Sequence, residues 1–186
     1  MKKAAVALLA GFVALACSVS SAFAAQPYLS GRFAVSMLSD SEITPASYDA
    51  GYTLAGAVGL DKGRYRIEAE LGRQSSGVSK SLRSLVMTTY MSNLSVDLDL
   101  PLAPLEPFIT AGVGLANVEE DDGIGGNVDD IVFAWQIGAG VGFDVAPLVT
   151  LEVQYRYLAA TDPELAEHQK YTIDNHNVLL GLRAGF

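Results

Sequence analysis

The chain has 186 residues, half of them hydrophobic, and a formal net charge of −9. This acidic balance argues against nucleic acid as a partner, because a surface that binds nucleic acid is normally basic. The longest apolar run after residue 24 lies at 131–149, and Gln136, Asp144 and Pro147 interrupt it, so it is a poor transmembrane helix. High apolar content without a helical span is typical of a small membrane β-barrel, with a soluble β-sandwich as the alternative.

The N-terminus predicts a secretory signal peptide. Two lysines precede a short apolar stretch at residues 4–16, and a polar patch then leads to the small-residue site Ala-Phe-Ala at 22–24. This order predicts cleavage before Ala25. We therefore expect residues 1–24 to be a signal peptide for Sec-type export and residues 25–186 to be one barrel domain. The alternative is an anchor that stays in the membrane, which the short apolar run disfavours.

The single cysteine of the chain, Cys17, lies inside the predicted signal peptide. A lipoprotein would have Leu three residues before its cysteine, where this chain has Ala14, so lipidation is the less favoured alternative. Cleavage would leave 162 residues without cysteine, and no disulfide would form in the periplasm. Because Lys2 and Lys3 would be removed, the mature charge would be −11.

Eight segments alternate apolar and polar residues with the period of a β-strand. In chain order they lie at residues 29–37, 52–60, 64–71, 86–99, 109–116, 133–144, 149–157 and 176–186. The third is the most informative, because one face is wholly charged (Arg64, Arg66, Glu68 and Glu70) and the other is apolar. In the eighth, Leu179 is the one large apolar residue on the otherwise small or polar face.

The connections between these segments alternate in length. The long ones are Ser39–Gly51, Ser75–Ser84, Val118–Asp130 and Ala159–Asp174, and the short ones are Asp61–Gly63, Pro101–Glu106 and Ala146–Leu148. A soluble sandwich has no reason for strict alternation, whereas outer-membrane barrels have long extracellular loops and short periplasmic turns. The sequence therefore predicts an all-β fold, an eight-stranded antiparallel up-and-down transmembrane β-barrel with both termini in the periplasm.

The polar face of the strands should line the lumen, because charge on the lipid side is costly. The candidate lumen charge network consists of Arg32, Arg64, Arg66, Glu68, Glu70, Glu152, Arg156 and Arg183, with Asp97 and Asp99 on the same face. An eight-stranded barrel has room for its side chains and little else, so we expect these charges to pair and fill the lumen. A narrow channel for ions or small solutes is the alternative. Aromatic residues near strand ends predict an interfacial girdle of Tyr28, Tyr52, Tyr65, Phe108, Phe143, Tyr157 and Phe186.

The last segment stops on Phe186, which resembles the C-terminal signature of bacterial outer-membrane barrels, where a terminal Phe is part of the assembly signal. Together with the alternating strands, the Tyr155-Arg156-Tyr157 run and the glycine repeats at 112–114 and 138–142, the predicted mature chain resembles the OmpA/OmpX-like and opacity-protein families of small outer-membrane proteins. The resemblance implies a monomer in the outer membrane that contacts lipopolysaccharide and requires periplasmic chaperones and the β-barrel assembly machinery. It also implies a structural or surface-interaction role, adhesin-like or antigenic, through the extracellular loops.

The sequence offers no catalytic, cofactor or metal site. Outer-membrane lipid A deacylases and palmitoyltransferases need a His near a Ser, but His168 lies in a polar loop and no H-x-S motif begins at His176. We therefore predict that the protein is not an enzyme, with a lipid-modifying enzyme as the remaining alternative.

Two groups of charged residues in the loops each allow two interpretations. The acidic stretch Glu119–Asp130 does not match an EF-hand, and it is either a solvated loop or a weak site for divalent cations, which would bridge to lipopolysaccharide. Arg73, Lys80 and Arg83 lie in or beside the second long connection. They are either lipid A phosphate contacts or ordinary surface charge.

Overall fold

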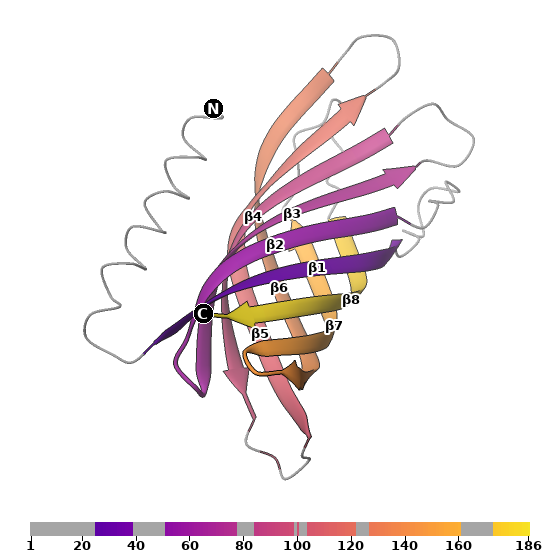
Figure 1. The fold of residues 1–186 in the computed structure, drawn as a ribbon. Helices are drawn as coiled ribbons and strands as arrows, with labels where there is room; N and C mark the ends of the chain where they lie inside the picture. The colour runs from indigo at the N-terminus through magenta and orange to yellow at the C-terminus, as the bar shows by residue number, and fades with distance from the viewer. Residues whose placement is uncertain are drawn as a thin grey trace.

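The structure, a computed structural model, describes residues 25–38, 51–77, 84–98, 100, 104–121, 127–160 and 173–186. Eight antiparallel strands form a closed barrel in which each strand pairs with the next and β8 pairs with β1 (Figure 1). In chain order they are β1 (Gln26–Leu38), β2 (Gly51–Asp61), β3 (Tyr65–Gly77), β4 (Ser84–Asp97), β5 (Leu105–Asp121), β6 (Asn127–Ala146), β7 (Val149–Ala160) and β8 (Ile173–Gly185). The predicted fold is confirmed. In the described part of the chain, no helix has the length and apolar character needed to cross a membrane.

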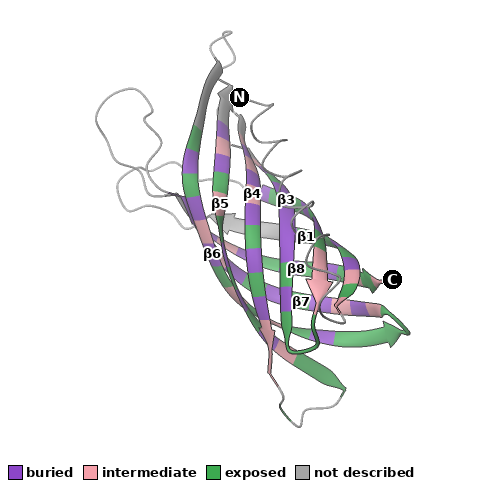
Figure 2. Ribbon diagram, turned by 90° about the vertical axis from the view of Figure 1, so that its left-hand side faces the viewer, coloured by how far each residue is buried: buried purple, intermediate pink, exposed green. Residues whose placement is uncertain are grey.

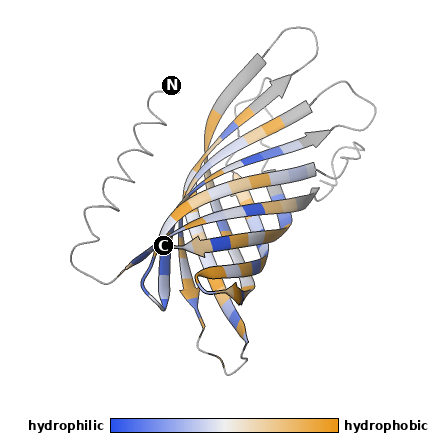
Figure 3. Cartoon of the chain, viewed as in Figure 1, coloured by the Kyte–Doolittle hydropathy of each residue, from blue (hydrophilic) through white to orange (hydrophobic). Residues whose placement is uncertain are grey.

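The two-residue period of the sequence becomes the two faces of the barrel wall (Figures 2 and 3). Outward residues are largely apolar and exposed; Val178, for example, is 59% exposed. Inward residues are buried, and many of them are polar or charged. Leu179 follows its inward parity and is buried, although its neighbours on that face are polar or glycine.

The short connections lie together at one end of the barrel. Between β2 and β3, the carboxylate of Asp61 accepts a hydrogen bond from the backbone N–H of Gly63, which has φ of 80°. Between β6 and β7 the register shifts at Asp144/Ala146, and Leu148 takes the left-handed φ of 67°. The C-terminus lies at this end too, where the N–H of Phe186 donates to the carbonyl of Pro27 (3.0 Å).

The connections at the other end run between β1 and β2, β3 and β4, β5 and β6, and β7 and β8, and most of their residues lie outside the described ones. One predicted loop boundary was wrong. β5 continues to Asp121 and β6 begins at Asn127, so much of the acidic stretch Glu119–Asp130 pairs as a hairpin, with Glu119 opposite Asp129. Turn-forming glycines first occur at positions 123, 125 and 126, and the two strands continue almost to them.

Candidate functional site: the lumen

The centre of the lumen is occupied by a guanidinium between two carboxylates. Arg32 on β1 donates to both oxygens of Glu68 (2.8 and 2.9 Å) and to Glu70 (2.8 Å), both on β3. All three side chains are buried. Charge-assisted and partly bidentate contacts of this kind are strong where water is excluded. Glu70 also receives two hydrogen bonds from Arg156 on β7 (2.7 and 2.9 Å), which extends the contact across the barrel.

A second guanidinium extends the network toward the short turns. Arg66 on β3 donates to Glu152 on β7 (2.7 Å) and forms a fork with Asp97 on β4 (2.7 and 3.1 Å). Arg183 on β8 also contacts Glu152 (3.0 Å) and reaches Asp61 at the end of β2 (2.9 Å). Two of these contacts, Arg66 to Glu152 and Arg183 to Asp61, join strands that are not neighbours in the sheet.

We call the three buried Arg–Glu pairs at mid-lumen the charged layer; its members are Arg32, Arg66, Arg156, Glu68, Glu70 and Glu152. Each is less than a tenth exposed. Their formal charges balance, three against three. The structure thus brings together seven of the eight candidate network residues, because Arg183 joins the layer through Glu152.

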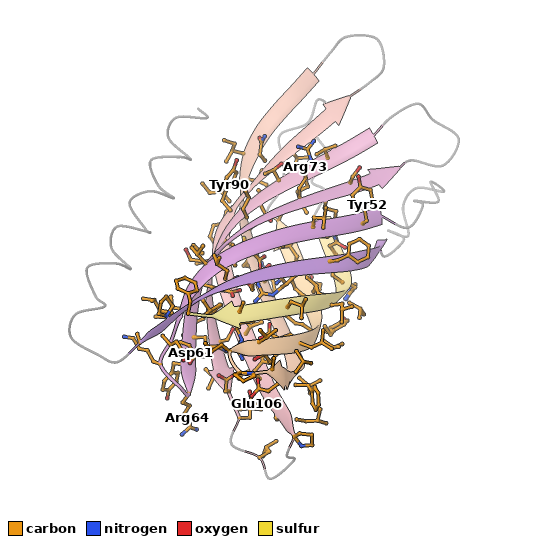
Figure 4. All side chains as sticks on the ribbon, viewed as in Figure 1. Tyr52, Asp61, Arg64, Arg73, Tyr90 and Glu106 are labelled. Atoms are coloured by element: carbon orange, nitrogen blue, oxygen red, sulfur yellow. The ribbon has the colours of Figure 1, made fainter. Side chains whose placement is uncertain are left out.

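The eighth candidate, Arg64, is a correction. It shares the parity of Arg66, but β3 begins at Tyr65, so Arg64 belongs to the preceding turn and is exposed. Figure 4 shows it at the outer edge of the short-turn end. The two-residue alternation predicts which side of the wall a residue faces only within a strand, and it does not apply to a residue in a turn. Asp99 lies outside the described residues.

Two expected girdle residues also lie inside the barrel. Tyr28 is 2% exposed and donates its hydroxyl to Glu68 (3.1 Å). Phe108 is 3% exposed, and the guanidinium of Arg66 lies 4.7 Å from its ring centroid, a cation–π contact. The strand alternation alone predicts that both face the lumen, because each is an even number of residues from an inward-facing one. Tyr28 is four residues from Arg32, and Phe108 is two residues from Thr110.

One row of paired residues explains how neutral side chains support the charges. The cross-strand register runs from Tyr28 through Gly59, Glu68, Asn93 and Gly112 to Gln136. The amide of Asn93 donates to Glu68 (3.0 Å), and the amide of Gln136 donates to Asn93 (2.6 Å). The two glycines leave the space that these side chains cross, since a β-carbon at either would overlap Tyr28 or Asn93. Sequence reasoning missed Asn93 and Gln136 as partners, because alternation gives the face but not the register.

The lumen beyond the charged layer, toward the long connections, changes character around the wall. On β4–β7 it is lined by a buried apolar cluster of Met87, Met91, Ala116, Val118, Val132, Ala134, Leu158 and Ala160. On the opposite wall the amide of Asn175 donates to Gln74. The outer half is therefore packed like a small protein core.

Two cavities lie on either side of the charged layer. The larger, about 830 Å³, is at the short-turn end; we call it the vestibule. Its lining includes Tyr28, Asp61, Asp97, Glu106 and Arg183. Figure 4 labels Asp61 and Glu106 at this end. The smaller, about 20 Å³, lies beyond Glu70 and Arg156, and a space of that size holds about one water molecule. The charged layer separates the two.

Other candidate groups have different surroundings. No three His, Cys, Asp or Glu side chains among the described residues are arranged to hold a metal ion. His176 contacts two tyrosines: its Nδ1 shares a hydrogen bond of 2.6 Å with the hydroxyl of Tyr155, and its ring is 5.1 Å from that of Tyr157. His168 lies outside the described residues. Phe186 is 67% exposed at the C-terminus.

Comparisons with known proteins agree with this architecture. A family model described as outer membrane protein beta-barrel domain matches residues 4–186. The outer membrane protein PagN of Salmonella typhimurium is 28% identical over 120 residues, which are 54% of this chain and 50% of PagN. The chain therefore spans about half the length of the curated relative it matches.

Solved structures resemble the chain over most of its length. Neisserial surface protein A has a TM-score of 0.66 and 18% identity, covering 86% of this chain and 97% of that one. Ail of Yersinia pestis has a TM-score of 0.54 and 13% identity, covering 87% and 99%. The barrel domain of Pseudomonas aeruginosa OprF gives 0.54 and 14%, with the same coverage. At these identities the likeness shows the fold alone.

Proposed function

Since this chain belongs to the outer membrane protein beta-barrel domain family, and so is an integral protein of the outer membrane, we propose that it is a non-conducting surface-interaction barrel. The filled barrel is a rigid support, and the long connections at one end meet partners outside the cell. In barrels of this kind the longer loops are extracellular and the short turns periplasmic.

The observation that supports a non-conducting role is the charged layer. Arg32, Glu70 and Arg156 form a buried chain from β1 through β3 to β7, with every N–O contact between 2.7 and 2.9 Å. An ion that moved from the vestibule to the outer half would have to separate these pairs. Breaking a buried pair is strongly unfavourable, at about 3–5 kcal/mol. The apolar cluster beyond it adds a second barrier.

The charge of the loops supports a partner that is not a polyanion. Residues 39–50, 119–130 and 161–172 carry net formal charges of −3, −6 and −2, and only residues 78–83, with Lys80 and Arg83, are positive. Ail has been crystallised with the heparin analogue sucrose octasulfate. We expect this chain to bind such a ligand poorly, because like charges repel it. A cationic or neutral partner, or one bridged by divalent ions, fits better.

Conductance of the refolded barrel in planar lipid bilayers tests the first half of the proposal. We expect wild type to be silent and Arg156→Ala to produce small, flickering openings, since a broken pair admits water. Arg64→Ala, in the exposed turn, is the matched control and should stay silent. Steady channels in wild type would replace this proposal with the narrow-channel alternative.

Loop replacement tests the second half. Residues 39–50 or 161–172 are replaced by an Asn-Gly turn, and folding is checked by the heat-modifiable mobility of the barrel on gels. Bacteria that display wild type should adhere to epithelial cells and should not bind immobilised heparin. Both loop variants should adhere less at equal surface level. Unchanged adhesion with both loops removed would contradict the surface-interaction role.

Three further parts of the proposal concern biogenesis and chemistry. Residues 1–24 direct export, and the assembly machinery and periplasmic chaperones recognise the C-terminal strand that ends at Phe186. The protein is a monomer and not an enzyme. The contacts of His176 with two tyrosines support the last point, because the lipid-modifying families named above pair a His with a Ser.

A further inference from the structure

The outward face of the barrel carries one formal charge among the side chains that the structure describes. It is Arg73, which shares the outward parity of Ile67 and Leu71 on β3 and is exposed. Every other Asp, Glu, Lys or Arg whose side chain the structure describes has the inward parity or, like Arg64, lies in a turn. A charge on the lipid side is far costlier at the bilayer midplane than near the interface. Arg73 therefore marks a level at which the membrane is polar.

The position of Arg73 along β3 identifies that level. β3 rises from the short-turn end, and Arg73 lies four residues before its end at Gly77, on the side of the long connections. Since long connections are extracellular in these barrels, Arg73 lies at the outer-leaflet interface. Figure 4 shows Tyr52, Arg73 and Tyr90 across β2, β3 and β4 in this part of the barrel.

The register surrounds Arg73 with groups that suit a lipid headgroup. Its direct cross-strand partners are Leu54 on β2 and Thr88 on β4. Tyr52 and Tyr90 lie on the same face, one diagonal step away on either side, which is within reach of long side chains. Tyrosines are enriched at this depth because the ring is apolar and the hydroxyl polar. Thr88, Tyr52 and Tyr90 are all hydroxyl donors.

The outward side chains that the structure describes include no Asp or Glu, so they offer the guanidinium no carboxylate on its own side of the wall. The carboxylates of outward parity all lie within two residues of the strand ends at the long connections; they are Glu119, Asp121, Asp129 and Asp174. An interfacial guanidinium is best satisfied by a bidentate anion, and phosphate matches its fork. The outer leaflet supplies such a group in the phosphorylated glucosamine headgroup of lipopolysaccharide.

We propose that Arg73, flanked by Tyr52 and Tyr90, is a binding site for a lipid A phosphate of the outer leaflet. The guanidinium holds the phosphate through two parallel hydrogen bonds, and the tyrosine rings confine the sugar that carries it. This contact is independent of what the extracellular loops bind.

Native mass spectrometry of the refolded barrel in detergent micelles tests the site. The probes are lipid A with two phosphates and the same lipid A without phosphate. We expect Arg73→Gln to weaken binding of the phosphorylated form about tenfold, as expected for a lost charge-assisted contact. Arg73→Lys should bind with intermediate affinity, because it keeps the charge and loses the fork. Arg64→Gln is the matched control at the opposite end of the barrel, and we expect it to bind as wild type does.

Two results would overturn the proposal. One is equal affinity of wild type and Arg73→Gln for the phosphorylated lipid, and the other is equal affinity of wild type for both lipids. Heat-modifiable mobility on gels checks that each variant is folded. If Arg73→Gln fails to fold, Arg73→Lys decides, since wild-type affinity in that variant would exclude the bidentate contact.

Discussion

Removal of Arg156 is the most direct test of how the lumen is stabilised. Its side chain is buried, and it donates two hydrogen bonds to Glu70, which is 1% exposed. In Arg156→Ala, Glu70 would keep its 2.8 Å contact with Arg32 and a longer hydrogen bond of 3.5 Å from the amide of Asn93. The carboxylate would then be buried with half of its compensation lost, because Arg32 is shared with Glu68.

The structure places the cost at the lower end of the known range. Breaking a buried ion pair costs about 3–5 kcal/mol. Arg156 also has a buried Nε without a hydrogen-bond partner among the described residues, and its removal relieves that cost. We therefore expect Arg156→Ala to lower the free energy of unfolding by about 3 kcal/mol. Glu70→Ala should cost about 5 kcal/mol, because it leaves two guanidiniums short of a carboxylate.

Urea unfolding of the barrel in phospholipid vesicles measures both values. The chain has one tryptophan, Trp135, on the outward face of β6, so its fluorescence reports transfer from lipid to water. Arg64→Ala serves as the control, and we expect a change within about 0.5 kcal/mol because this side chain is exposed on a turn.

The double variant Glu70→Ala/Arg156→Ala distinguishes a paired network from two independent residues. A direct pair predicts a coupling of at least about 1 kcal/mol, so the double variant should be more stable than the sum of the single losses implies. Additive losses, or equal urea midpoints for Arg156→Ala and Arg64→Ala, would refute the reasoning. Such a result together with wild-type conductance would favour the channel.

Three further predictions test other parts of the barrel. Leu148→Gly should stabilise by about 1 kcal/mol in the same urea assay, because Leu148 has φ of 67° and glycine adopts this conformation freely. Gly140→Ala should destabilise by about 1–3 kcal/mol, because a β-carbon there would lie 2.6 Å from both Cζ of Phe108 and the carbonyl oxygen of Val153; a lower thermal midpoint would show it, and an unchanged one would mean that the ring has room to move. Deletion of Phe186 should lower the heat-modifiable fraction recovered from outer membranes, and an unchanged fraction would remove this residue from the assembly signal.

The sequence predicted the strands, their closure and the inward face, because a two-residue period is a local property that the chain shows directly. It could not predict partners. Glu68 binds Arg32, Tyr28 and Asn93 because of the register, which depends on hydrogen bonding around the whole barrel. Opposite charges on one face allow many pairings, and alternation does not choose among them.

Strand ends were the weakest part of the prediction. Arg64 was assigned to the lumen by parity although it lies in a turn, and Tyr28 was assigned to the girdle although parity places it inside. Near an end, residue type and parity compete. Inside a strand of the structure, a residue's parity determines which side of the barrel wall it faces. Beyond the strand end, the backbone conformation of the turn determines it.

The span of the ion pairs along the chain has a consequence for assembly. Arg66 and Glu152 are 86 residues apart, and Arg183 and Asp61 are 122 apart. Neither contact can form within a growing hairpin, since each joins strands that face each other across the lumen only when β8 pairs with β1. An unclosed sheet would also separate Arg156 on β7 from Glu70 on β3, and unpaired charge is unfavourable in a membrane. Partly inserted forms should therefore be scarce, and insertion and closure should occur as one cooperative, slow step with a high contact order.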